Sequence, residues 1–227
     1  MKKHNIVTDS PPKAPRAATG AAIPPPRPLA GATFVIAAAH PSQLPQDGPP
    51  EIAFAGRSNA GKSSAINALA RQTRLAFASR TPGRTQQIVV FALQKGGLVA
   101  DLPGYGYAAV PHDVKRAWQQ FLWEYITTRS TLVGLVLVVD ARHGLKALDT
   151  ALLDGYLPSA RPLLVLATKS DKLNRAERRD AAQAIRAALA ERYPHAATLT
   201  TVLPFSATSR DGVEEADAIL ESWLPRE

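Results

Sequence analysis

The sequence of 227 residues predicts an α/β fold with a mostly parallel sheet, one antiparallel strand and helices on both faces of the sheet. Two observations predict it. From about residue 51 onward, apolar runs of strand length alternate with amphipathic stretches of helical length, and this alternation is typical of parallel sheets with crossover helices. Two of the apolar runs are separated by Lys95-Gly96-Gly97, which indicates a hairpin and supplies the antiparallel strand.

The individual elements follow in order along the chain. We expect strands at 52–55, 87–93, 98–102, 133–140, 163–168 and 199–203, and helices at 62–70, 114–129, 146–157, 175–192 and 211–223. A short apolar patch at 33–38 is a candidate edge strand. Asn174/Glu177 and Asp211/Glu214 have the spacing of capping boxes, so they predict where the last two helices begin.

Composition divides the chain into two parts. More than half of its 19 prolines lie in the first 50 residues, and such a segment has too little apolar surface to offset chain entropy. We therefore expect a disordered Pro/Ala-rich extension at 1–32 and a single folded domain at 33–227. The absence of cysteine excludes a disulfide framework and a thiolate metal site. No signal peptide and no run of about 20 apolar residues is present, so we expect a cytoplasmic protein without a membrane segment.

The segment from Gly56 to Ser63 fits the phosphate-binding pattern G-x-x-x-x-G-K-[ST] between a strand and a helix. Glycine allows the backbone to bend closely enough to point several N–H groups at phosphates. Lys62 then reaches the β- and γ-phosphates, and the Ser63 hydroxyl binds Mg²⁺. The predicted phosphate-binding residues are Gly56, Arg57, Ser58, Asn59, Ala60, Gly61, Lys62, Ser63 and Ser64.

A second phosphate-sensing element, D-x-x-G, stands at the end of a predicted strand as Asp101, Leu102, Pro103 and Gly104. The carboxylate can hold the Mg²⁺ shell, and the glycine N–H can sense a γ-phosphate. Upstream, the irregular segment 81–86 offers a threonine that completes the shell only when the γ-phosphate is present. We choose Thr85 over Thr81 because Thr85 lies nearer the next strand.

These segments complete the predicted phosphate and metal site. The first switch contributes Gly83, Arg84, Thr85, Gln86 and Gln87. The predicted catalytic residues are Lys62, Thr85 and Gly104, and the predicted Mg²⁺ ligands are Ser63, Thr85 and Asp101.

A third motif indicates which nucleotide base the site binds. Thr168-Lys169-Ser170-Asp171 follows an apolar strand and matches N-K-x-D except that threonine replaces asparagine. The Asp171 carboxylate can accept hydrogen bonds from guanine N1–H and the 2-amino group, which adenine does not offer, so the motif favours GTP. Thr168 is shorter than asparagine, so one contact to the base or to the phosphate loop is expected to be rearranged. Phe205-Ser206-Ala207 fits the short element whose backbone contacts the guanine oxygen.

Taken together, GRSNAGKSS, TPGRTQ, DLPGYGYA, TKSDKL and FSA resemble the EngB family of bacterial GTPases. The resemblance implies a Ras-like P-loop GTPase fold and Mg²⁺-dependent hydrolysis of GTP to GDP and phosphate. It also implies assistance in assembling the large ribosomal subunit, with a role in cell division and septation. The expected partners are GTP, GDP and the large subunit with its rRNA, and neither a membrane nor DNA. A formal net charge of +8 agrees with a polyanionic partner.

Two rival functions stay open at this point. A non-catalytic, GTP-dependent scaffold at the division site would carry the same binding motifs. A nucleoside or metabolite kinase would need a lid and an acceptor pocket, and the TKSD motif argues against it.

Within the GTPase reading, Tyr105 stands where many switch GTPases carry a glutamine, so intrinsic hydrolysis is expected to be slow. Asn59 is a candidate K⁺ ligand that would assist it. Trp123 is a candidate exposed partner anchor, and Arg175, Arg179 and Arg186 form a candidate RNA-binding face.

Overall fold

The structure, a computed structural model, describes residues 25–77, 87–106 and 112–225, with only the backbone of residues 41 and 112–119. Its described strands form one seven-stranded sheet in the order β1-β3-β4-β2-β5-β6-β7. β3 runs antiparallel to both β1 and β4, and the remaining neighbours pair in parallel, which confirms the predicted sheet. The strands are β1 (Thr33–Ala38), β2 (Glu51–Gly56), β3 (Ile88–Ala92), β4 (Leu98–Asp101), β5 (Leu132–Asp140), β6 (Leu163–Thr168) and β7 (Thr200–Pro204).

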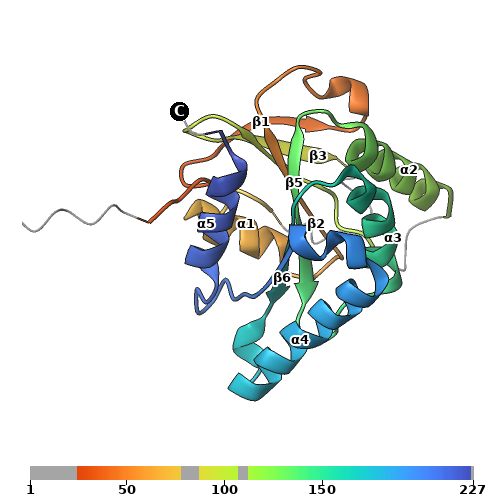
Figure 1. Cartoon of the computed structure of the whole chain (residues 1–227). Helices are drawn as coiled ribbons and strands as arrows, with labels where there is room; N and C mark the ends of the chain where they lie inside the picture. The colour runs from red at the N-terminus through yellow and green to blue at the C-terminus, as the bar shows by residue number, and fades with distance from the viewer. Residues whose placement is uncertain (1–24, 78–86, 107–111, 226–227) are drawn as a thin grey trace, which may run out of the picture.

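Helices cover both faces of this sheet, as predicted (Figure 1). The helices are α1 (Lys62–Ala70), α2 (His112–Thr128), α3 (Ala147–Tyr156), α4 (Arg175–Arg192) and α5 (Val213–Trp223). α1 and α5 share one apolar core with one face of the sheet, whereas α2, α3 and α4 share a second core with the other face. The chain therefore has three layers, with the sheet in the middle.

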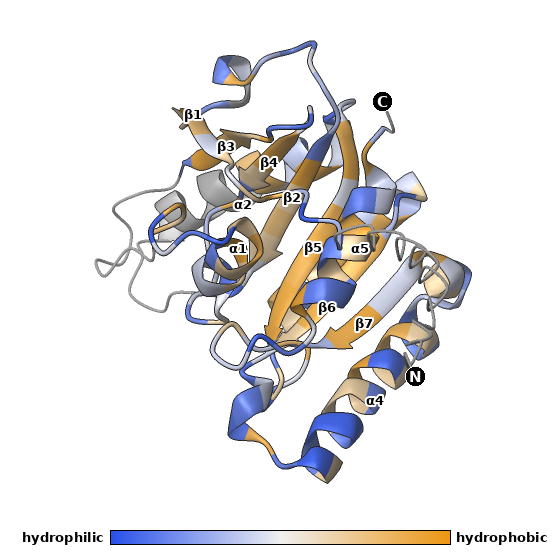
Figure 2. Cartoon of the chain, turned by 90° about the vertical axis from the view of Figure 1, so that its left-hand side faces the viewer, coloured by the Kyte–Doolittle hydropathy of each residue, from blue (hydrophilic) through white to orange (hydrophobic). Residues whose placement is uncertain are grey.

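The sequences of the central strands are nearly continuous apolar runs because both faces of these strands are buried. Every residue of β2 and β6 is buried, and β5 is buried at all but one position. Figure 2 shows this as hydrophobic ribbons along β2, β5 and β6 beneath helices with mixed surfaces. The carboxyl ends of β2, β4, β5, β6 and β7 lie on one edge of the sheet, so the motif-bearing loops that follow them meet there.

Helix starts test the capping predictions. Asn174 caps α4 as predicted, because its side chain accepts from the Glu177 backbone N–H at 3.0 Å and Glu177 reciprocates. The second capping-box prediction, at Asp211 and Glu214, is wrong. Gly212, at a left-handed φ of 74°, precedes α5 without a side-chain cap. The Asp211 carboxylate instead accepts from Ser209 at 2.8 Å and from Arg178 at 3.1 Å.

At the amino-terminal side, the predicted edge strand is present as β1 and pairs with β3. Leu29 and Ala32 are buried in the core under α1 and α5. The packed part of the described chain thus begins a few residues before the boundary expected at residue 32.

Trp123 on α2 is 48 % exposed, in keeping with the exposed position expected from the sequence. Its ring nevertheless covers Gly155 of α3, where an added Cβ would lie 2.6 Å from the ring. One face of Trp123 is therefore an internal helix–helix contact. In the described part of the chain, no helix has the length and apolarity needed to cross a membrane.

Two buried ion pairs lie away from the motif-bearing edge. Glu51, fully buried at the start of β2, accepts from Arg129 Nη2 at 2.9 Å and from the Tyr125 hydroxyl. On the other face of the sheet, Asp217 of α5 accepts from Arg71 Nη2 at 2.7 Å. Each pair ties a helix to a neighbouring element through the core.

Candidate guanine nucleotide site

The phosphate loop spans the five residues between Gly56, the last residue of β2, and Lys62, the first residue of α1. Asn59 and Gly61 turn the loop through left-handed conformations, with φ of 62° and 100°. Gly56 allows close passage past β5, because an added Cβ would lie 2.6 Å from the Val138 carbonyl oxygen. Gly61 provides no side-chain cap for α1. The backbone N–H groups at this helix start are therefore suited to binding an anion.

The structure brings the D-x-x-G segment against this loop. Asp101 is the last residue of β4, and its Oδ1 pairs with Lys62 Nζ. Gly104 lies beside the loop, since an added Cβ would stand 3.4 Å from Ser58 Cα. The predicted lysine, carboxylate and glycine thus meet at one place.

The residues at this place fit Mg²⁺. The Ser63 hydroxyl and the Asp101 carboxylate are oxygen donors, which is the ligand type that Mg²⁺ prefers alongside water and phosphate. The described residues contain no group of three His, Cys, Asp or Glu side chains that could hold a metal by themselves. Water and phosphate oxygens, which usually accompany one or two protein ligands on Mg²⁺, would complete the shell.

Tyr105 lies directly after Gly104 and is fixed through both its backbone and its side chain. Its N–H donates to the Gly56 carbonyl at 3.3 Å, and its carbonyl accepts from the Ser58 N–H at 2.7 Å. The ring is 3 % exposed and packs in the core under α3, with its hydroxyl donating to Asp149 Oδ1 at 2.6 Å. Burial and the neighbouring Asp149 raise the pKa of Tyr105. The ring therefore turns into the core.

At the base-reading motif, the substitution of threonine for asparagine keeps the contact to the phosphate loop. Thr168 is the buried last residue of β6. Its Oγ1 bonds to the Ala60 carbonyl of the loop and lies 3.1 Å from the Val139 carbonyl of β5. The rearrangement expected from the shorter side chain therefore spares the loop contact, and Thr168 ties β6 to both β5 and the loop.

Asp171 and Ser206, from two predicted motifs 35 residues apart, lie side by side. Ser206 Oγ donates to Asp171 Oδ1 at 2.7 Å and accepts from the Thr208 and Ser209 N–H groups. This hydrogen bond from Ser206 lowers the pKa of the Asp171 carboxyl. The loops also join through their backbones, because the Ser170 N–H donates to the Phe205 carbonyl at 3.2 Å. The carboxylate is thus held ionised as an acceptor.

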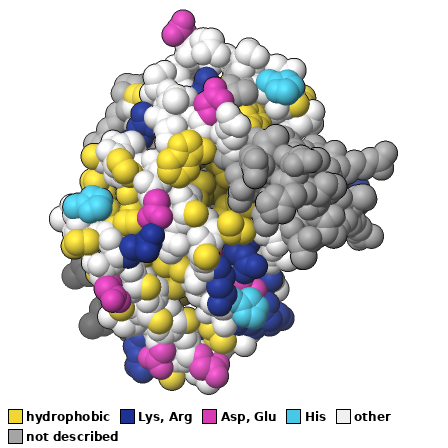
Figure 3. Space-filling model, turned by 90° about the vertical axis from the view of Figure 1, so that its right-hand side faces the viewer, with side chains coloured by type: hydrophobic (Ala, Val, Ile, Leu, Met, Phe, Trp, Pro, Cys, Tyr) yellow, Lys and Arg dark blue, Asp and Glu magenta, His cyan; other side chains and the backbone are white. Residues whose placement is uncertain are grey.

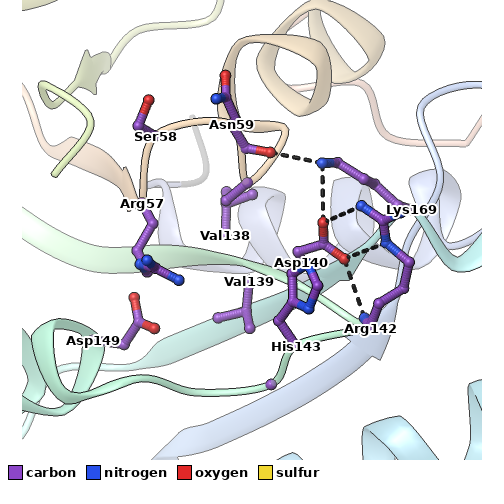
Figure 4. Close-up of a pocket in the computed structure, with 12 residues that line it drawn as sticks. Arg57, Ser58, Asn59, Val138, Val139, Asp140, Arg142, His143, Asp149 and Lys169 are labelled. Carbon is purple, nitrogen blue, oxygen red and sulfur yellow. Dashed lines mark hydrogen bonds and ion pairs between the residues drawn. The ribbon is translucent and has the colours of Figure 1, made fainter. Parts of the chain in front are cut away.

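Sequence reasoning missed Asp140 and Arg142, which support Lys169 (Figure 4). Lys169 Nζ donates to the Asn59 carbonyl at 2.7 Å and pairs with Asp140 Oδ2 at 3.0 Å. Arg142 holds both carboxylate oxygens of Asp140, at 2.9 and 2.7 Å. Burial would raise the pKa of Asp140, but the hydrogen bonds from Arg142 and Lys169 outweigh it and lower that pKa. The available signal was the aspartate that closes the apolar strand β5, one strand before the strand that leads into TKSD.

These residues border a pocket of about 350 Å³. It lies between the phosphate loop, the end of β5, the loop at 142–144 and the start of α3. Four Arg, Lys or His side chains line it, namely Arg57, Arg142, His143 and Lys169. Figure 3 shows Lys and Arg side chains gathered around a histidine on the face of the molecule that carries α2, α3 and α4.

Some predicted residues lie outside the described part of the chain. They are Gly83, Arg84, Thr85 and Gln86 of the first switch. Gln87, the last predicted residue of the first switch, directly precedes β3.

Comparisons with known proteins agree with this architecture. A family model described as a 50S ribosome-binding GTPase matches residues 51–169, and the GTP-binding domain of elongation factor Tu matches residues 118–226. A probable GTP-binding protein EngB of Azoarcus sp. (strain BH72) is 50 % identical over 193 residues, covering 85 % of this chain and 91 % of that protein. The corresponding protein of Dechloromonas aromatica (strain RCB) is 46 % identical, covering 85 % and 87 %.

Solved structures share the fold. A crystal structure of a probable GTP-binding protein EngB has a TM-score of 0.58 at 22 % identity and covers 76 % of this chain and 97 % of its own. Era bound to MgGDPNP and a segment of 16S ribosomal RNA has a TM-score of 0.59 at 19 % identity, with coverages of 79 % and 58 %. The sequence motifs, the sheet order and the relatives agree: this chain belongs to the EngB family and is a P-loop GTPase.

Proposed function

We propose that this GTPase is a Mg²⁺-dependent switch that assists assembly of the large ribosomal subunit in the cytoplasm. The observation that carries the proposal is the match of residues 51–169 to a family described as 50S ribosome-binding GTPases, supported by EngB relatives over 85 % of the chain. A role in cell division and septation then follows indirectly, because a shortage of ribosomes delays growth and division.

We assign the nucleotide to the edge where the motifs meet. Asp171, held by Ser206, accepts from the guanine N1–H and 2-amino groups, and the Lys169 stem lies along the base. The N–H groups of the phosphate loop and Lys62 bind the phosphates. Mg²⁺, held by Ser63, Asp101 and, in the GTP state, Thr85, would neutralise phosphate charge during hydrolysis. Gly104 senses the γ-phosphate.

Two surfaces offer cations to rRNA. On α4, Arg186 already donates to the Val202 carbonyl at 2.8 Å and Arg178 to the Leu173 carbonyl at 2.9 Å, whereas Arg175 and Arg179 are exposed. Part of the predicted arginine face therefore supports the fold. The second surface is the basic rim of the pocket, which places positive charge beside the nucleotide.

Sedimentation with 50S subunits tests the switch. The full chain is centrifuged through sucrose gradients with 50S particles in GDP and in a nonhydrolysable GTP analogue. We expect stronger association with the GTP analogue, falling steeply with salt, since each neutralised phosphate contributes about 0.7–0.9 to the log–log slope. Equal association in both nucleotides would contradict the switch, and a flat salt response would contradict rRNA contact.

A monovalent cation is our proposed aid to hydrolysis, because Tyr105 turns into the core and cannot orient water as glutamine does. Asn59, exposed on the phosphate loop, is the candidate K⁺ ligand. We expect faster GTP turnover in K⁺ than in Na⁺ at equal ionic strength, and loss of that difference in Asn59→Ala. Identical rates in the two salts would leave the ribosome as the activator.

A further inference from the structure

Asp149 lies outside every motif found in the sequence and is 1 % exposed near the start of α3. Its Oδ2 accepts the Lys146 backbone N–H at 2.8 Å, which fixes the first turn of α3. Its Oδ1 accepts the Tyr105 hydroxyl at 2.6 Å. One buried carboxylate thus joins α3 to the residue that follows the D-x-x-G segment, 44 positions away in the sequence.

Tyr105 transmits this contact to the phosphate loop. Its backbone bonds to Gly56 on one side and to Ser58 on the other, at 3.3 and 2.7 Å. Gly104, the preceding residue, packs against Ser58 Cα. With its hydroxyl held by α3 and its backbone held by the loop, Tyr105 has little freedom to rotate, and the orientation of the Gly104 peptide follows from it.

Arg57 completes the contact between these segments. An added Cβ at Gly106 would lie 3.2 Å from Arg57 Nε. Figure 4 shows the Arg57 guanidinium directed toward Asp149. Burial raises the pKa of Asp149, and the positive charge of Arg57 offsets part of that rise. The phosphate loop, the D-x-x-G segment and α3 therefore meet around one carboxylate.

We propose that Asp149 is a positioning residue for γ-phosphate recognition: by holding the Tyr105 hydroxyl, it fixes the Gly104 amide beside the phosphate loop and so favours GTP over GDP. The inference rests on the role proposed above for Gly104. GDP has no γ-phosphate for that amide to bind, so only the GTP complex gains from holding the amide in place beforehand.

Two conservative variants of the full chain, Tyr105→Phe and Asp149→Asn, test this. Tyr156→Phe is the matched control, since Tyr156 lies on the same helix, is buried, and donates to the Pro162 carbonyl at 2.7 Å. Affinities for fluorescent GDP and a fluorescent nonhydrolysable GTP analogue are measured with kcat and KM, and thermal unfolding confirms folding.

We expect Tyr105→Phe to lower the ratio of GTP-analogue to GDP affinity by roughly three- to tenfold, the effect of one buried hydrogen bond. GDP affinity should be unchanged. The double variant should show little further loss, because both changes break the same contact. Tyr156→Phe should lower the melting temperature without moving the ratio.

A ratio that is unchanged or raised in Tyr105→Phe, or an equal loss for both nucleotides, would overturn the inference and leave Asp149 a purely structural residue. Gly104→Ala separates this from a failure of the proposed site. If Gly104→Ala also leaves GTP-analogue affinity intact, the role of Gly104 itself is wrong. If Asp149→Asn does not fold, Tyr105→Phe, which removes a single oxygen atom, decides the question.

Discussion

Carboxylates at the motif-bearing edge of the sheet differ from those buried elsewhere in the core. Asp140 and Asp171, at the edge, have lowered pKa values because several donors surround each of them. Glu51 and Asp217, in the core, have raised pKa values, since burial outweighs the pairing with one arginine each. The donors around Asp140 and Asp171 thus keep these two acids ionised, whereas burial opposes ionisation of Glu51 and Asp217.

This difference in pKa predicts which substitutions change nucleotide binding and which change the stability of the fold. An ionised carboxylate with a lone pair directed outward can accept hydrogen bonds from a ligand, and preserving its charge costs little where donors already surround it. A buried ion pair contributes little net stability, but breaking it leaves an uncompensated charge. Substitutions of the edge carboxylates Asp140 and Asp171 should therefore change nucleotide binding with little effect on folding, and substitutions in the core ion pairs should do the reverse.

The largest expected effect is at the edge, in Asp171→Asn. The amide can still accept from Ser206 but presents an N–H to the base. GTP affinity should fall and xanthosine triphosphate affinity should rise, shifting the preference by on the order of 10⁴, the discrimination typical of a site built around a specific donor. Competition titrations against fluorescent GDP measure it.

Asp180→Asn, an exposed acid on α4, is the control for this substitution. Unfolding midpoints of both variants should stay near wild type. Unchanged GTP affinity in Asp171→Asn would remove Asp171 from the site and end the contrast between edge and core.

Arg129→Met probes the core. It leaves the Glu51 carboxylate buried with the Tyr125 hydroxyl as its remaining side-chain partner in the described chain. Breaking a buried ion pair from one side costs about 3–5 kcal/mol of unfolding free energy. Urea unfolding should show that loss, whereas GDP affinity of the folded protein should not change. Adding Glu51→Gln should recover part of the stability, and a double variant no more stable than Arg129→Met would contradict this account.

How much of this the sequence could predict depends on the distance between partners. Local patterns found the P-loop, D-x-x-G and TKSD with the strands that carry them, because each is fixed by spacing within a few residues. The contacts of Asp140 with Lys169 and of Tyr105 with Asp149 join residues 29 and 44 positions apart. The pairing of β5 with β6 and the packing of α3 bring these residues together. The spacing of residues along the chain therefore could not predict the contacts.

Two local predictions show the same limit. Asp211 had capping-box spacing, yet Gly212 could adopt the left-handed turn that starts α5, and the Asp211 carboxylate was drawn to Ser209 and Arg178. Arg186 is exposed as the spacing predicts, but its guanidinium also donates to the Val202 carbonyl of the neighbouring strand β7. In both cases the side chain hydrogen-bonds to a residue that the fold brings close and that the local sequence pattern could not include.

A smaller effect at the edge is expected from Thr168→Val. Valine keeps the shape of threonine but leaves the Ala60 carbonyl without this donor, and an unsatisfied buried acceptor costs about 1–3 kcal/mol. Because the lost bond holds the phosphate loop, GDP affinity should fall together with stability. Thr168→Asn, which restores a donor, should bind GDP close to wild type. Equal affinity in the valine and asparagine variants, measured by fluorescent GDP titration, would show that the loop does not need this bond.

The smallest expected effect at neutral pH is that of Asp217→Asn, although its pH dependence is distinctive. Burial raises the pKa of Asp217 from 3.8 to about 6, and its Oδ1 has no hydrogen-bond partner among the described residues. Between about pH 4 and 6 the folded chain holds a proton that the unfolded chain has lost, so unfolding free energy falls as pH rises through this window, by up to about 3 kcal/mol. Asparagine does not titrate, so the variant should lack this component.

At pH 7.5 the same variant loses the ion pair with Arg71 but also escapes the cost of burying a charge. The Arg71 side chain is 21 % exposed, so water can solvate its charge once the partner is gone, unlike the buried Glu51 left by Arg129→Met. These changes therefore nearly cancel, to within about 1 kcal/mol. Urea unfolding of wild type and Asp217→Asn at intervals from pH 4 to 8 measures the difference between the two curves, which removes contributions from every other titrating group. The curves should diverge toward low pH, with wild type gaining relative stability as Asp217 becomes protonated. Parallel curves would mean that Asp217 stays ionised throughout, and then the core, like the edge, would keep its carboxylate charged.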